Sequence, residues 1–124
     1  MSSKTKNIFG WVLAGLVAAL FLFSASGKLM ANEEALKMAS NFGLDASSFK
    51  MLGVVEVIAA LLFLYPRTGV LGTLLLASYM GGAIATHLEH GESIVAPCVI
   101  QAFLWIVAVF RFPELKSRIM SNNS

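Results

Sequence analysis

Four long apolar stretches, separated by shorter polar ones, dominate the pattern of hydrophobic and polar positions along the chain. They occupy residues 8–27, 49–65, 69–86 and 94–112. A helix rises about 1.5 Å per residue, so about 20 apolar residues are needed to cross a hydrocarbon layer of about 30 Å. The first stretch has that length and no charge, and the others are slightly shorter. The pattern therefore predicts four membrane spans within a single domain over residues 1–124.

The residues that stop and start helices fit these boundaries. Pro66–Thr68 is the only connection between the second and third stretches, and this predicts a tight turn between two antiparallel helices. The fourth stretch begins after the polar segment 87–93 and closes at Arg111 and Pro113. We expect the chain to finish in a short polar tail.

The longer connection between the first two stretches has the pattern of a short amphipathic helix. Glu33 and Lys37 are interleaved there with apolar Leu36 and Met38, and Gly43 is suited to end such a helix. A helix of this kind lies along the surface of a membrane. The predicted fold class is all-α, an integral membrane four-helix bundle with a short interfacial helix between helices 1 and 2.

Composition weighs against a soluble helical bundle, which the shorter stretches would permit if each were seen alone. Apolar residues make up 57% of the chain and charged residues 13%, against about 25% charged in ordinary soluble domains. Four apolar stretches in succession leave too little polar surface to face water. The lipid bilayer is therefore the predicted environment.

The first stretch also resembles a secretory signal peptide. Lys4 and Lys6 would be its charged leader, and the small residues 24–26 its cleavage site. Its apolar run is longer than a usual signal core and leads directly into Lys28 and Leu29. These two features favour an uncleaved helix.

Charge indicates orientation and excludes one class of partner. The net charge of +2 is small and the basic residues are spread along the chain, so nucleic acid is not expected as a partner. Basic residues collect on the cytoplasmic side of membrane spans. The segments that flank the spans on one side of the membrane hold six basic residues, Lys4, Lys6, Arg67, Arg111, Lys116 and Arg118. Those on the other side hold three, Lys28, Lys37 and Lys50. This predicts a multi-pass protein of the cell (inner) membrane with both termini in the cytoplasm.

The polar side chains within or at the ends of the predicted spans are the candidate site residues. Lys28 ends the first span, Glu56 lies about two turns (~10 Å) into the second, and Gln101 lies about two turns into the fourth. His87 ends the third span, on the face that carries Tyr79. All these positions fall in the outer half of the bundle. We predict that Lys28 and Glu56 form a charge pair, with His87 and Gln101 close enough to complete one polar cluster.

Each of these residues also has a structural interpretation. Lys28 could mark a helix end by extending its ammonium to the interface, and Gln101 could hydrogen-bond a neighbouring helix. Glu56 could serve a structural ion pair, a proton-transfer step or a ligand. The spacing of His87 and His90 could suit a metal, but no cysteine pair supports it, so no metal site is predicted.

Three segments resemble the DoxX-like family of small bacterial four-helix membrane proteins. They are FSASGKL at residues 23–29, GVVE at 53–56 and ATHL at 85–88, and the resemblance in their order and spacing covers nearly the whole chain. It implies a four-helix membrane fold and a loose association with redox systems, because the family name derives from a subunit of an oxidase that passes electrons to quinone. The family's polar positions correspond here to Ser26, Lys28, Glu56 and His87, without an established catalytic role.

The leading functional hypothesis is an accessory membrane subunit whose polar cavity binds a small amphipathic molecule, with quinone as the candidate ligand, or steadies a redox partner subunit. A small transporter or a proton-conducting protein is the alternative, with Glu56 and His87 as titrating groups. An independent enzyme is less favoured, since no nucleophile and base, phosphate-binding loop or strong metal motif is present. Glycines in the third stretch could serve contacts within one chain or with a second copy in a homo-oligomer.

Overall fold

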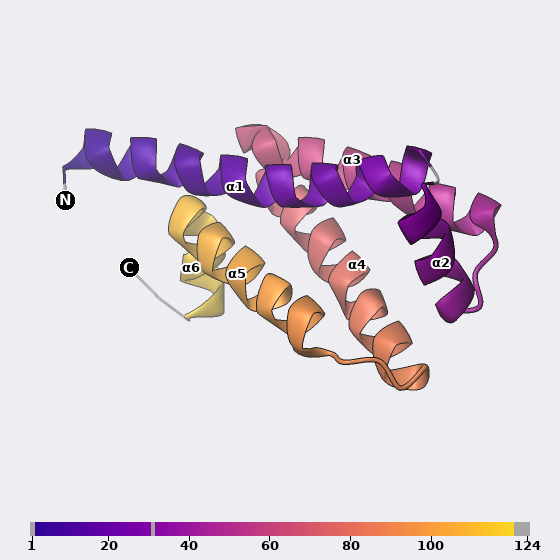
Figure 1. Cartoon of the computed structure of the whole chain (residues 1–124). Coiled ribbons are helices and arrows are strands. Elements are labelled where there is room, and N and C mark those ends of the chain that lie inside the picture. The colour runs from indigo at the N-terminus through magenta and orange to yellow at the C-terminus, as the bar shows by residue number, and fades with distance from the viewer. Residues whose placement is uncertain (1, 31, 121–124) are drawn as a thin grey trace.

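The computed structural model describes residues 2–30 and 32–120, and in these residues it contains helices and no strand (Figure 1). The described part consists of six α-helices and one short 3₁₀ helix, η1. Their bounds are α1 Ser3–Met30, α2 Glu33–Asn41, α3 Ala46–Leu64, η1 Pro66–Thr68, α4 Gly69–Glu89, α5 Val95–Arg111 and α6 Pro113–Ile119.

The segment expected to be a short polar tail begins with a helix. Residues Pro113–Ile119 form helix α6, which is bent by 111° from α5. Phe112 has extended backbone between the two helices, and Pro113 opens α6, where its missing N–H costs no hydrogen bond. From the sequence, Pro113 was interpreted only as the end of the fourth helix, although proline is also well suited to the first turn of a helix.

The connection between α1 and α3 is organised by side-chain caps. Asn32 accepts a hydrogen bond from the backbone N–H of Ala35 at the start of α2, and Asp45 accepts one from Ser48 at the start of α3. Hydrogen bonds from the backbone and the side chain of Ser48 lower the pKa of the exposed Asp45 carboxyl below its usual value. Gly43 adopts a positive φ of 70°, which glycine accepts without strain, and the chain turns there from α2 toward α3.

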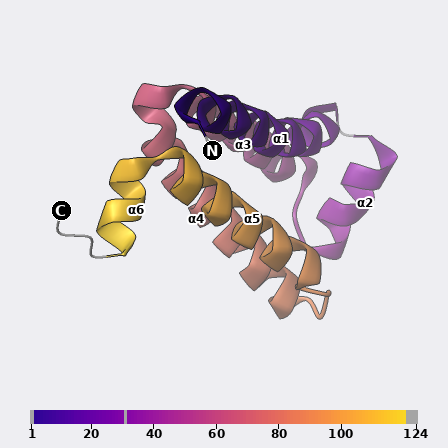
Figure 2. The ribbon, with the colours of Figure 1, turned by 90° about the vertical axis from the view of Figure 1, so that its left-hand side faces the viewer.

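The helices pack as two pairs that cross at an angle. α1 runs along α3, and α4 runs beside α5; α3 and α4 are joined through η1 (Figures 1 and 2). The core lies between the pairs and is mostly small or apolar. Its fully buried members include Ala14 of α1, Ala60 and Phe63 of α3, Leu76 of α4 and Leu104 of α5.

Length and composition make these helices a membrane bundle. In the described residues, α1, α3 and the continuous η1–α4 segment are long and apolar enough to cross a bilayer, and α5 with α6 adds a fourth, bent candidate. Many large apolar side chains face outward. Phe23, Val99 and Ile106 are more than half exposed, so a hydrocarbon solvent suits this surface better than water. The number of spans and the interfacial position of α2 remain predictions.

Arg111 ties the end of α5 to the end of α3. Its guanidinium donates from Nη1 to the carbonyl of Phe63 and from Nη2 to that of Leu64, both at 2.6 Å. These carbonyls belong to the last turn of α3, where the helix itself supplies no N–H partner. The same guanidinium stacks 4.6 Å from the Trp11 ring of α1. Arg111 therefore joins three helices at the end of the bundle that carries the N-terminus.

Candidate functional site

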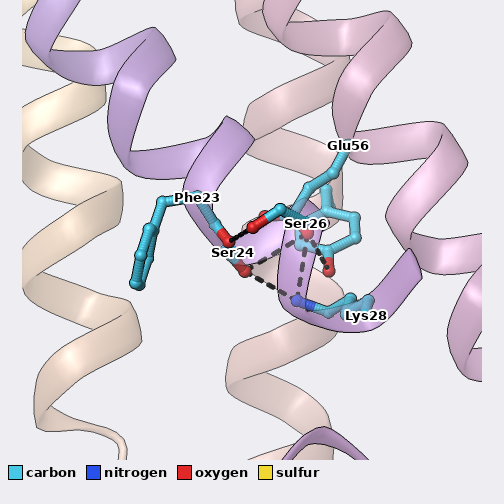
Figure 3. A network of polar contacts seen from close by, with 6 residues as sticks. Phe23, Ser24, Ser26, Lys28 and Glu56 are labelled. Carbon is cyan, nitrogen blue, oxygen red and sulfur yellow. Dashed lines mark hydrogen bonds and ion pairs between the residues drawn. The ribbon is translucent and has the colours of Figure 1, made fainter. Parts of the chain in front are cut away.

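The opposite half of the bundle contains a polar network built by three helices. α1 supplies Ser24 and Lys28, and α3 supplies Glu56 (Figure 3). α4 supplies Tyr79. Gly53 allows the α1–α3 approach, because a Cβ there would lie only 3.0 Å from the Lys28 Cβ and 3.3 Å from the Ala25 carbonyl oxygen. The close approach brings the Lys28 side chain to the level of Glu56.

Glu56 is at the centre of this network. The residue is 1% exposed, and its Oε1 lies 3.0 Å from the Lys28 Nζ, so the predicted charge pair forms. Tyr79 donates its hydroxyl to the same oxygen at 3.1 Å. Glu56 lies ten residues after Ala46, the first residue of α3, which corresponds to about 15 Å along the helix.

Ser24 connects the two charges of the pair. Its Oγ accepts a hydrogen bond from the Lys28 Nζ at 2.7 Å and donates one to Glu56 Oε1 at 3.3 Å (Figure 3). A buried carboxylate without partners would cost several kcal/mol in a low-dielectric interior. Here one oxygen of Glu56 accepts from an ammonium and two hydroxyls, which allows the charged form to remain in the bundle.

A cavity of about 670 Å³ opens beside the network. Its polar lining includes Ser24, Lys28, Glu56, Tyr79 and His87. Most of the remaining wall is apolar and comes from α1, α2, α3, α4 and α5, including Phe21, Phe23, Met38, Phe42, Phe49, Leu52, Met80, Pro97 and Ile100. A few polar groups in an apolar wall of this size are typical of a small-molecule site.

His87 lines the cavity without bonding to the ion pair. Its Nδ1 lies 2.6 Å from the carbonyl oxygen of Ala83. A carbonyl only accepts, so Nδ1 carries the hydrogen, and Nε2 of the neutral ring is left as an acceptor. Phe42, next to the C-terminus of α2, packs on this ring at a centroid distance of 4.7 Å and on that of His90 at 5.8 Å. The aromatic contact joins Phe42, the C-cap residue of α2, to the C-terminal end of α4 at the edge of the cavity.

Two of the candidate residues named from the sequence make other contacts. Ser26 is exposed and donates to the carbonyl of Phe23 at 2.7 Å. It is two residues from both Ser24 and Lys28 in α1, and residues at that spacing lie on different faces of a helix. Gln101 donates from Nε2 to the Ala77 carbonyl at 3.1 Å, and it is not part of the cavity wall. Its Oε1 is buried and has no hydrogen-bond partner in the described residues. Gln101 thus serves the α4–α5 contact, and the single cluster expected to include it is wrong in that respect.

Ser24 and Phe42 are the site residues that the sequence reading missed. Ser24 precedes Lys28 by four residues, the spacing at which helical side chains meet, so its hydrogen bond to Lys28 had a detectable signal. Phe42 had only the amphipathic pattern of its helix as a signal. Its partner His87 is 45 positions later in the sequence, and no local pattern links them.

Two other chemistries receive no support from the geometry. The described residues contain no group of three or more His, Cys, Asp and Glu side chains arranged to hold a metal ion. Cys98 is a free, exposed thiol. It lies within the apolar helix α5, and it does not line the cavity.

The comparisons with known proteins agree with this architecture. A family model described as the DoxX-like family matches residues 12–110, which include the four residues of the polar network, most of α1, and all of α3 and α4. No curated protein and no solved structure gave a match to the chain. Because the family match spans most of its 124 residues, the chain belongs to the DoxX-like family.

Proposed function

We propose that this protein is an accessory membrane subunit of a redox system and that its cavity beside Glu56 binds the head group of a quinone. The observation that carries the proposal is the 670 Å³ cavity, which adjoins a buried charge pair within an otherwise apolar bundle. Ligand sites commonly have volumes of about 300–1,000 Å³ and a mostly apolar wall. A ring with two oxygens and an apolar tail has the matching chemistry.

The polar groups of the wall suit both redox forms of such a head group. The Lys28 ammonium carries three N–H groups, two of which donate to Ser24 and Glu56, so one remains for a quinone carbonyl. The Nε2 of neutral His87 can accept a hydrogen bond from a quinol hydroxyl. The aromatic and methionine side chains supply the apolar contacts for the ring.

In the proposed arrangement four helices span the inner membrane of a bacterium, with both termini in the cytoplasm and the cavity in the outer half of the bilayer. The basic residues of η1, of α6 and of the first turns of α1 lie at one end of the bundle, which supports this orientation. A subunit with this cavity would hold quinone for a redox partner subunit or deliver quinone to it. The alternative assembly is a homo-oligomer of this chain. On this proposal the chain is not an enzyme by itself.

A cavity-filling variant tests ligand binding without removing any polar group. Gly82 lines the cavity, and a Cβ there meets nothing within 4 Å, whereas its neighbour Gly81 has equal space but lies outside the cavity wall. We expect Gly82→Leu to weaken binding of a short-chain quinone by at least roughly tenfold, about 1.4 kcal/mol, and Gly81→Leu to leave it unchanged. Equilibrium binding of decylubiquinone to the purified protein in detergent measures this. Equal affinities of the two variants would contradict the proposal.

Proton conduction is the second hypothesis, and the geometry favours it less. A proton path needs groups that exchange protons in sequence, whereas Glu56 is held by an ammonium and two hydroxyls that stabilise its charged form. Passive proton flux through proteoliposomes above the protein-free background, lost in Glu56→Gln, would favour this hypothesis over quinone binding.

A further inference from the structure

A second cavity lies at the end of the bundle that carries the N-terminus. It has a volume of about 580 Å³ and is formed by the start of α1, η1, the end of α5 and the start of α6. Lys6, Asn7 and Trp11 of α1 line it together with Arg111 and Glu114. This wall differs from that of the cavity beside Glu56 because it is rich in polar and charged side chains and has no buried charge pair.

Arg111 is fixed in place but keeps hydrogen-bond donors that meet no acceptor among the described residues. A guanidinium has five N–H groups, and two of them donate to the carbonyls of Phe63 and Leu64. These bonds and the stacking on Trp11 hold the group in one orientation at the cavity wall. A preoriented guanidinium with free N–H groups is the side chain best matched to a phosphate.

The charge of the wall also favours an anion. Lys6 and Arg111 contribute two positive charges and Glu114 one negative charge, which leaves one net positive charge. The Lys6 Nζ lies 5.8 Å from the centre of the Phe110 ring, and Asn7 adds an amide on the same wall. Basic pockets between membrane helices near the cytoplasmic surface bind anionic lipid head groups.

We propose that this second cavity binds the phosphate head group of an anionic phospholipid, through Lys6 and Arg111. The site is separate from the quinone cavity, so either proposal can fail alone. Its occupant would anchor the long first helix to α5 and α6 at the membrane surface.

Trp11 provides the readout for the test. The chain has two tryptophans, so Trp105→Phe leaves Trp11 as the only one, at the wall of this cavity. Brominated phosphatidylglycerol and brominated phosphatidylcholine are titrated separately against the full-length protein in detergent, and quenching of Trp11 fluorescence gives their relative affinities. We expect phosphatidylglycerol to bind on the order of fivefold more tightly, as about one basic side chain contributes at a membrane surface.

Matched lysine variants separate a site from diffuse charge attraction. Lys6 lines the cavity, whereas Lys4 is exposed two residues earlier on α1 and does not. Lys6→Gln should abolish the preference for phosphatidylglycerol, and Lys4→Gln should retain it. Equal loss in both variants, or no preference in the unsubstituted protein, would overturn the proposal. Competition by glycerol phosphate at the same concentration as the lipid would overturn the lipid as the occupant.

Discussion

Replacing Lys28 alone with methionine is expected to lower the free energy of unfolding by about 3–5 kcal/mol. The substitution removes the only cation that the structure places on Glu56, whose side chain is 2% exposed in the described fold. A stranded carboxylate must then stay charged in a low-dielectric interior or take up a proton, and both cost stability. Equilibrium unfolding in mixed micelles, followed by circular dichroism, measures the loss.

The double variant Lys28→Met, Glu56→Leu should recover most of this loss. Removing both charges leaves no unpaired ion, and buried ion pairs often contribute little net stability compared with apolar residues of similar size. Lys50→Met is the matched control, because Lys50 is exposed near the start of α3 and makes no ion pair within the described residues. Strictly additive effects of the two single substitutions would show that the pair is not coupled.

The same double variant separates a structural from a functional role for the pair. If it folds normally but no longer binds quinone, the charges are retained for the ligand rather than for the fold. Lys28 and Glu56 both line the cavity, so we expect this second outcome under the proposed function.

The variant Gly72→Ala should disrupt the packing of α4 on α3. A Cβ at Gly72 would overlap the backbone of Phe63 and lie 2.7 Å from the carbonyl carbon of Leu62. Backbone atoms cannot rotate away as a side chain can, so the two helices must separate. We expect a loss of about 3 kcal/mol in the free energy of unfolding, the upper end of the usual cost of overpacking.

Gly81→Ala is the control for helix propensity. A Cβ at Gly81 of the same helix meets nothing within 4 Å, and alanine favours a helix by up to about 1 kcal/mol over glycine in water. This variant should therefore be neutral or slightly more stable when unfolding is measured in the same micelles. A Gly72→Ala protein as stable as Gly81→Ala would mean that α3 and α4 do not approach as closely as described.

Hydropathy alone was enough to predict the all-α membrane class, because an apolar stretch of about 20 residues has few other stable environments. It could not predict how the helices cross. Their relative positions depend on close approaches at residues such as Gly53 and Gly72, and the sequence does not show which of its ten glycines contact another helix. The bend into α6 was missed because Pro113 is compatible with either the end or the start of a helix.

The candidate site was predictable in its charges and less so in its uncharged members. Lys28 and Glu56 were conspicuous because a charge in hydrocarbon is costly. Ser24 was overlooked because a hydroxyl costs little there, although its spacing from Lys28 indicated a contact. Gln101 was wrongly grouped with them, since its depth along α5 agreed with the cluster but its partner is the Ala77 carbonyl of α4. Depth is readable from sequence, whereas the face of each helix that meets the others depends on tertiary packing.

Photoaffinity labelling with an azidoquinone, followed by mass spectrometry of the labelled peptides, tests most directly whether the cavity beside Glu56 is a quinone site. The account predicts labels concentrated on cavity residues such as Phe42, Phe49 and Met80, and suppressed by excess unlabelled quinone. Labels spread over lipid-facing residues such as Val99 and Ile106, and not reduced by competition, would contradict it.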